Sequence, residues 1–213
     1  MEENQSLGIP YVKILPKPEA RIMMIGRDPS PRTAKIVGIP DGKSVFIKEI
    51  FSLAKDSGTR DENIYITDVC KCHWRTSRGI PLKGTKERER KLDKGLAKIC
   101  INNWLVEEIK ILCPKLIVSF GEEVYSLLMQ YIVEPNPAPK NLSLTKDKSR
   151  VDAELFFIEG GSFNIKFGNI ISAFAPLRHP GNTTSLQRSD PTDKRWNVYQ
   201  MSRQKVVKLM QGI

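Results

Sequence analysis

Length, composition and charge exclude several classes of protein. The chain has 213 residues, 40% hydrophobic and 27% charged, which is enough to bury one sizeable core and atypical of disordered or fibrous proteins. Lys and Arg number 34 against 24 Asp and Glu, and this net charge of +10 favours a polyanionic partner, although a basic solvated surface is the alternative. With no long apolar run and an acidic start, we expect a cytoplasmic protein that does not enter a membrane.

Apolar runs rich in β-branched residues predict buried strands, and patterns with helical spacing lie between them. The predicted strands are 21–26, 63–69 and 115–121, and the predicted helices are 44–58, 91–112 and 122–131. Gly58 is the expected residue that ends the first helix. Prolines and charges at 134–152 predict a flexible insertion, followed by a hairpin or two late strands at 154–161 and 163–174 and a closing helix within 189–210.

Strands that alternate with helices of this length predict parallel pairing through right-handed crossovers. We therefore expect a single α/β domain spanning 1–213, a three-layer α/β/α sandwich around a mostly parallel sheet of about four strands. Ligands of such sheets bind at the carboxyl ends of the strands. That rule selects the loops at 26–32, 68–75 and 174–184.

The first loop, GRDPSPR (26–32), places Asp28 just past a strand. Gly26 permits unusual backbone angles and two prolines restrict the chain, which suits a rigidly held catalytic carboxylate. The alternative is an ordinary turn that caps a helix. The late loop, APLRHPGNTT (175–184), contains His179, one of only two histidines, which is either functional or structural.

The ordered set of motifs resembles the uracil-DNA glycosylase superfamily. GRDPSP is similar to a water-activating G-x-D-P loop of that superfamily, and ITDVCKC, PKLIVSFG and RHPGN are closer to its iron-sulfur branch. The likeness runs from Arg21 to about Leu186. It implies a monofunctional enzyme that flips a damaged base out of DNA, hydrolyses its N-glycosidic bond and leaves an abasic site for base excision repair.

The resemblance also implies roles for individual residues. Asp28 positions the attacking water and stabilises the cationic sugar, and His179 donates a hydrogen bond to the base oxygen. The backbone around Arg27 contacts the same oxygen. A further set contacts DNA, with Leu186 or Arg178 as the side chain that enters the duplex: Ser30, Arg178, Asn182, Thr183, Leu186 and Arg188.

Three departures from the family pattern bear on the substrate and cofactor. Asp68 stands where the uracil-specific members usually carry asparagine. An ionised carboxylate at this position accepts a hydrogen bond from an exocyclic amine of the base, and a protonated one donates to a carbonyl. The alternative is that Asp68 caps a loop and does not contact a base. The phenylalanine that stacks on the base is missing from its usual segment, and Phe46 is the nearest aromatic, with Trp74 as another candidate.

The early C-x-x-C of the iron-sulfur branch is also absent, so an iron-sulfur cluster would have to use Cys70, Cys72, Cys100 and Cys113. Buried thiols and no cofactor are the expectation. The basic segment 73–94 is either a DNA-backbone contact or a solvated face.

The sequence thus predicts a monomeric DNA glycosylase that acts on a deaminated or altered base in duplex or single-stranded DNA. Two alternatives remain: an inactive superfamily member that binds DNA or a nucleotide, and a Rossmann-like enzyme that uses GRDPSPR as a phosphate loop. The second is disfavoured because the loop lacks the glycines and lysine that cradle phosphates.

Overall fold

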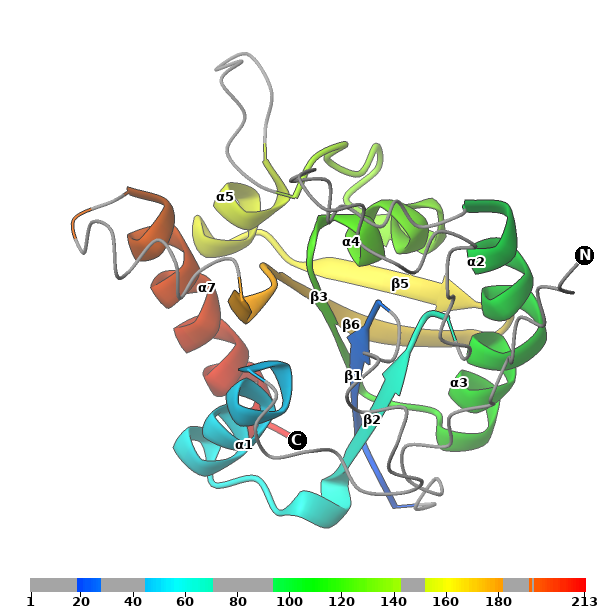
Figure 1. The fold of residues 1–213 in the computed structure, drawn as a ribbon, viewed down its shortest axis with the longest axis horizontal. Helices are drawn as coiled ribbons and strands as arrows, with labels where there is room; N and C mark the ends of the chain where they lie inside the picture. Colours follow the sequence, from blue (N-terminus) through cyan, green and yellow to red (C-terminus); the bar gives the residue numbers. More distant parts are fainter. Residues whose placement is uncertain (1–18, 28–44, 71–93, 143–151, 182–191, 193) are drawn as a thin grey trace, which may run out of the picture.

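The computed structural model describes residues 19–27, 45–70, 94–142, 152–181, 192 and 194–213 (Figure 1). These residues form a six-stranded sheet with the order β2-β1-β3-β6-β5-β4. The first four strands in that order are parallel, and β5 and β4 extend the sheet antiparallel. In chain order the strands are β1 (Ile22–Gly26), β2 (Ile64–Asp68), β3 (Leu116–Phe120), β4 (Ile132–Glu134), β5 (Phe163–Phe167) and β6 (Ile170–Leu177).

Helices cover both faces of this sheet, which confirms the predicted α/β sandwich. Helices α1 and α7 pack on each other at one side, and α2, α3 and α4 lie at the other (Figure 1). The helices are α1 (Val45–Ser57), α2 (Lys94–Cys100), α3 (Val106–Leu112), α4 (Glu122–Leu128), α5 (Ala153–Ile158) and α7 (Lys194–Gln211). The four parallel strands match the predicted sheet of about four, and the two antiparallel strands are additional.

The parallel strands are buried on both faces because helices cover both sides of the sheet. All five residues of β1, β2 and β3 are buried, which is why these strands read as continuous apolar runs in the sequence. By contrast, β5 alternates between buried and partly exposed residues. The predicted late strand at 163–174 is strand, but it is divided into the hairpin of β5 and β6.

Helix α1 ends where the sequence predicts. Gly58 adopts a left-handed φ of 70°, and its amide donates to the carbonyl of Lys55. The amide of Thr59 donates to the carbonyl of Ala54 at 3.0 Å. This pair of hydrogen bonds is a Schellman motif, in which glycine avoids the steric penalty that a Cβ atom would incur.

The predicted helix at 91–112 is continuous over its described part, 94–112, but changes its winding. A π-helical segment, Ile101–Leu105, joins α2 to α3. Cys113 then terminates α3 in the left-handed region with φ of 46°. The predicted helix at 122–131 is also present, as α4 followed by a 3₁₀ turn at Met129–Tyr131.

The prediction of a strand at 154–161 is wrong, because most of this segment is helix α5. Its buried residues are Ala153, Glu154 and Phe157, which share one face at helical spacing. A short apolar run does not distinguish a strand from a buried helical turn. Gly160, with φ of 108°, stands just past the end of α5.

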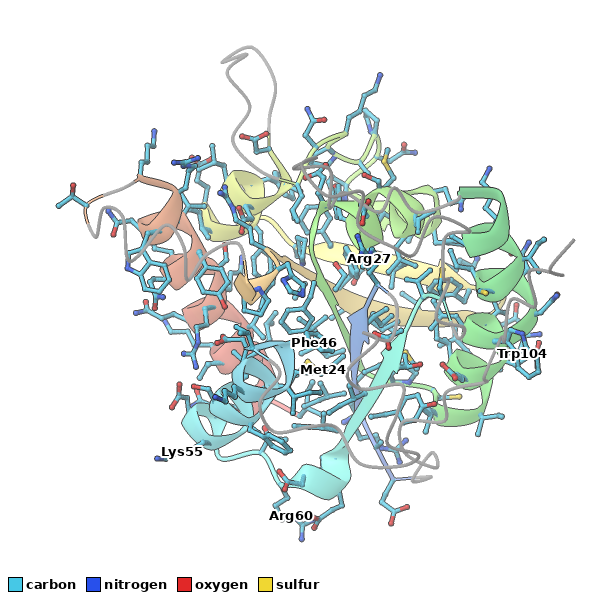
Figure 2. The ribbon with its side chains drawn as sticks, viewed as in Figure 1. Met24, Arg27, Phe46, Lys55, Arg60 and Trp104 are labelled. Atoms are coloured by element: carbon cyan, nitrogen blue, oxygen red, sulfur yellow. The ribbon has the colours of Figure 1, made fainter. Side chains whose placement is uncertain are left out.

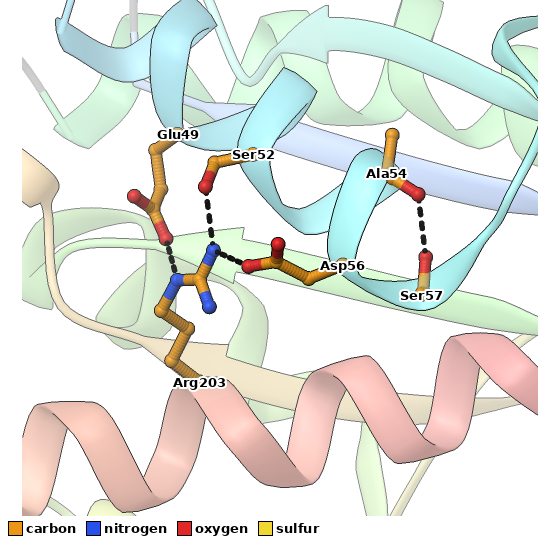
Figure 3. Close-up of polar contacts among 6 residues, drawn as sticks. All are labelled: Glu49, Ser52, Ala54, Asp56, Ser57 and Arg203. Atoms are coloured by element: carbon orange, nitrogen blue, oxygen red, sulfur yellow. Dashed lines mark hydrogen bonds and ion pairs between the residues drawn. The ribbon is translucent and has the colours of Figure 1, made fainter.

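A single arginine clamps α1 to α7. The Nε atom of Arg203 donates to Glu49 at 2.7 Å, and one Nη atom donates to Ser52 and Asp56 (Figure 3). The predicted closing helix is therefore α7, and its partner α1 is held in place. This matters for function because α1 begins beside the carboxyl ends of the strands.

The first part of the predicted insertion at 134–152 packs on α4. The Leu142 amide donates to the Glu122 carboxylate, and the Tyr125 hydroxyl donates to the carbonyl of Pro139. Residues 143–151 lie outside the described part, so flexibility of the insertion stays a prediction, as does the single-domain organisation. Within the described ranges, no helix has the length and apolar character needed to span a membrane.

Candidate active site

The carboxyl ends of the parallel strands bring four chain segments to one edge of the sheet. Gly26 at the end of β1 pairs in register with Asp68 at the end of β2. Phe120 at the end of β3 pairs with Leu177 at the end of β6. Because loops at this edge form the ligand sites of open α/β sheets, the residues that follow these strands are the first candidates.

Gly26 leaves the space that the Asp68 side chain occupies. A Cβ atom at position 26 would collide with Oδ1 of Asp68 and would lie 3.1 Å from the ring of Phe46. Gly26 is in strand β1 and does not use the unusual backbone angles that glycine permits, because its φ is not positive. The glycine is needed for close approach of side chains, and this places Asp68 and Phe46 together.

Phe46 connects this pair to His179. Its ring lies almost parallel to the imidazole, with centroids 6.2 Å apart and planes 14° apart. It also meets Phe120 edge to face at 5.0 Å, which fixes its orientation from the β3 side. Phe46 is 8% exposed, so most of its surface is in these contacts, and it is drawn near the strand ends in Figure 2.

His179 is oriented by the short loop after β6. The amide N–H of Gly181 donates to Nδ1 of the imidazole at 3.1 Å. In the neutral ring the proton then sits on Nε2, which is left as a hydrogen-bond donor. Gly121, in the left-handed region with φ of 99°, holds the start of this loop, because its amide donates to the carbonyl of Leu177 at 2.7 Å.

Asp68 provides a carboxylate inside the same cluster. The residue is 4% exposed, at the last position of β2. The amide of Val69 donates to the carbonyl of Gly26 at 2.9 Å, so the two strand ends continue side by side beyond the sheet. A buried carboxylate near an aromatic ring can distinguish ligands by their hydrogen-bond donors.

Arg27 lies at the edge of the cluster and faces α4. Its Nη1 atom forms an ion pair with Glu123 at 2.7 Å, and both side chains are partly exposed (Figure 2). Its carbonyl accepts a hydrogen bond from the amide of Cys70 at 2.9 Å. The guanidinium is therefore held by α4, and the first residue of the 27–32 loop has a fixed position.

The comparison with family models agrees with this arrangement. The model of the uracil DNA glycosylase superfamily matches residues 12–198, most of the chain. The chain belongs to the uracil DNA glycosylase superfamily. Members of this superfamily are generally DNA glycosylases, hydrolases that act on DNA.

Of the residues that the superfamily resemblance assigns to the site, Phe46 lies near both Asp68 and His179, and Arg27 follows the strand end that contacts Asp68. Asp28 follows Arg27 directly but lies outside the described residues. So do the other residues named for DNA contact and stacking: Ser30, Trp74, Asn182, Thr183, Leu186 and Arg188. Their roles stay predictions.

The side chain of Arg178 is buried, unlike a side chain that enters a DNA duplex. Its Nε atom donates to the carboxylate of Glu154, and the residue is 8% exposed. A side chain that enters a duplex must reach solvent, and the buried Arg178 side chain does not. The wedge assignment itself stays a prediction.

The described cysteines do not fit the four-thiolate site of the iron-sulfur branch. Cys70 and Cys100 are buried, whereas Cys113 is exposed and its thiol donates to the carbonyl of Lys110 at 3.3 Å. Within the described ranges, no group of three or more Cys, His, Asp or Glu residues is arranged to hold a metal ion. Cys72 lies outside these ranges, and we derive no step through a cluster.

Sequence reasoning missed three residues that shape the site. Gly121 donates from its amide to the carbonyl of Leu177, Glu123 pairs with Arg27, and Glu154 pairs with Arg178. The glycine after the strand KLIVSF is a visible signal for a turn at a strand end. The two glutamates have no sequence signal, because their partners are 96 and 24 residues away.

Proposed function

We propose that the protein is a monofunctional DNA glycosylase that flips a deaminated or otherwise altered base out of DNA and hydrolyses its N-glycosidic bond. The observation that carries the proposal is the position of Phe46 near both Asp68 and His179, at the edge of the sheet where the 27–32 loop begins. Superfamily membership and the net charge of +10 support DNA as the substrate.

The imidazole of His179 supports departure of the base. As the bond from the base nitrogen to the sugar breaks, the electron pair stays on the base and negative charge develops on its carbonyl oxygen. The Nε2–H of His179 donates to that oxygen, with Nδ1 held by the Gly181 amide. A donor fixed before the reaction stabilises this charge without reorganisation.

Water completes the reaction under the direction of Asp28. The carboxylate stabilises the cationic sugar and orients the water, whose oxygen forms the new bond to the sugar carbon. The proton released from water is taken up by the departing base, so the products are a neutral free base and an abasic site. We propose that these steps need no cofactor and that the enzyme acts as a monomer in the cytoplasm.

The chemistry of Asp68 supports a substrate other than plain uracil. An ionised carboxylate only accepts hydrogen bonds, so it repels a carbonyl oxygen of the base and accepts a hydrogen bond from an exocyclic amine. A protonated carboxyl donates to a carbonyl instead. Cytosine-like bases fit the first state and deaminated purines fit the second.

The substrate is identified by strand scission after alkali treatment. Oligonucleotides that carry uracil, hypoxanthine, xanthine or altered cytosine are incubated with the protein, and scission reports abasic sites. We expect cleavage of at least one lesion by the native chain. Asp28→Asn should abolish cleavage and leave DNA binding intact; survival of activity in this variant would contradict the mechanism.

The Asp68→Asn substitution tests the base-reading role. An amide supplies both a donor and an acceptor, so the preference should move toward uracil. The test compares initial rates on uracil and on the preferred lesion for both proteins. An unchanged ratio would remove Asp68 from the base pocket.

One observation favours a second candidate, a superfamily member that binds DNA or a nucleotide without cleaving it. Asp68 stands where the uracil readers of the superfamily usually carry asparagine. Under this alternative the protein binds lesion oligonucleotides but cuts none of them. The same panel of oligonucleotides separates the two candidates.

A further inference from the structure

A buried ion pair lies directly beside the residue that carries the imidazole. Strand β6 ends at Leu177, whose carbonyl accepts a hydrogen bond from the Gly121 amide at 2.7 Å. Arg178 follows, and its Nε atom donates to Oε2 of Glu154. The side chains are 10% and 0% exposed, respectively. His179 is the next residue, so only one peptide unit separates it from this pair.

The helix that carries Glu154 is a rigid support. At the start of α5, the amides of Ala153 and Glu154 donate to the carbonyls of Asn141 and Leu142 at 2.9 and 3.1 Å. Helix α5 packs on both α7 and β6. The carboxylate is thus fixed by backbone hydrogen bonds and by packing on two elements.

The pair is not built to maximise stability. Oε1 of Glu154 and one Nη atom of Arg178 are buried and have no hydrogen-bond partner within the described residues. The attraction within a buried ion pair offsets the free-energy cost of desolvating the two charges only when their remaining polar atoms also form hydrogen bonds. An incompletely satisfied pair contributes little net stability, whereas it still fixes the position of the chain that carries it.

We propose that Glu154, acting through Arg178, positions the imidazole of His179 for its hydrogen bond to the departing base. This inference rests on the proposed function. Three constraints then surround the ring: the anchored Arg178 before it, the Gly181 amide on Nδ1 and the ring of Phe46. Glu154 is a positioning residue, because its bonds reach His179 only through its neighbour.

Electrostatics makes the anchor sensitive to pH. Burial raises the pKa of Glu154 to about 7, Arg178 opposes this rise through its side chain and backbone, and Asp152 adds to it. From α7, the Lys205 ammonium binds the far end of α5, at the carbonyls of Phe157 and Gly161. The carboxylate is therefore ionised mainly above pH 7, and the anchor strengthens as the pH rises.

Nitrogen-15 NMR of the labelled full chain tests the placement without relying on activity. The protein has two histidines, so a His179→Ala spectrum assigns the imidazole signals. We expect the native His179 signals to report the Nε2–H form and to shift with an additional titration near pH 7. In Glu154→Gln that additional titration should vanish and the Gly181 amide should move. Unchanged signals in Glu154→Gln would overturn the inference.

Kinetics tests whether the placement matters for the reaction. Glu154→Gln should lower kcat about tenfold to hundredfold with little change in KM, because a small misplacement of a reacting group has effects of this size. In the His179→Ala background the same substitution should have no further effect. An equal loss in both backgrounds, or native kcat in Glu154→Gln, would overturn the inference.

A matched control changes a contact of α5 but keeps the anchor and the backbone hydrogen bonds at the start of the helix. Lys205→Met removes the bonds to the carbonyls of Phe157, near the other end of α5, and Gly161, just beyond it, and it should leave kcat and the His179 signals unchanged. If Glu154→Gln fails to fold, Arg178→Lys, which keeps the charge but loses the planar guanidinium, is measured in the same way. If no lesion is cut yet the His179 signals respond to Glu154→Gln, the proposed function fails and the placement stands.

Discussion

The ring of Phe46 lies 6.2 Å from the imidazole of His179, and the two planes differ by only 14°. Phe46 lies in the first turn of helix α1 and His179 follows strand β6, so the two nearly parallel rings come from positions 133 apart in the sequence. The position of α1 therefore controls the surroundings of the imidazole.

Replacing Phe46 by leucine should impair the reaction. The substitution removes an aromatic contact worth about 1 kcal/mol, and the freed imidazole should lower kcat roughly fivefold. Phe51→Leu is the matched control, since Phe51 lies in the same helix but is 48% exposed. Single-turnover cleavage of the preferred lesion measures both variants, and equal rates would refute the role of the stack.

Gly26→Ala should displace the Asp68 carboxylate. The new methyl group would collide with Oδ1 of Asp68 and press on Phe46, which we expect to destabilise the fold by about 1–3 kcal/mol. Discrimination between lesions should weaken because the base-reading carboxylate moves. Gly212→Ala, where a Cβ atom has an ordinary 3.6 Å contact, serves as control in urea unfolding and cleavage assays. Full selectivity in Gly26→Ala would contradict the proposed arrangement.

Arg203→Met should detach α1 from α7. The guanidinium is 15% exposed and binds Glu49, Ser52 and Asp56, so its loss should lower the free energy of unfolding by about 1–3 kcal/mol. Arg60→Met is the control, because the Arg60 side chain is 74% exposed and its ion pair with Glu62 is worth well under 1 kcal/mol. Urea denaturation measures both. Similar losses of unfolding free energy in the two variants would contradict a stabilising role for the contacts of Arg203.

The free energy of unfolding of the native chain, compared with that of the Glu154→Gln variant, should fall as the pH rises toward 8. Burial raises the pKa of Glu154 from 4.5 to about 7, so between these values the folded state binds more protons than the unfolded state. Its stabilising contribution is complete below about pH 4.5 and is lost as the pH passes 7, a change on the order of 3 kcal/mol. Urea midpoints from pH 5 to 8 provide the measurement. A difference that does not change with pH would contradict this prediction.

Local signals in the sequence account for most of the fold. The apolar runs at β1, β2 and β3, and Gly58 after α1, identify elements whose structure is set by neighbouring residues. Helix α5 was missed because six residues with two adjacent phenylalanines fit either periodicity. Contact with α7 and β6 decides that segment, and such contacts are not visible locally.

Some features of the candidate site were likewise visible in local sequence, and others depend on contacts between distant segments. Asp68, Phe46 and His179 were identifiable by residue type and by position at strand ends, and the structure brings them together. The space-making role of Gly26 and the link from Arg178 to Glu154 depend on contacts between distant segments. A buried arginine and an exposed one look alike in a sequence, so the burial of Arg178 is not predictable from it.

The most direct test of the central claim is a crystal structure of the protein bound to an oligonucleotide with an uncleavable analogue of the preferred lesion. We predict one extruded base with Nε2 of His179 and a carboxylate oxygen of Asp68 both within about 3 Å of its polar atoms. A base that stays stacked in the duplex, or one that contacts neither side chain, would contradict the account.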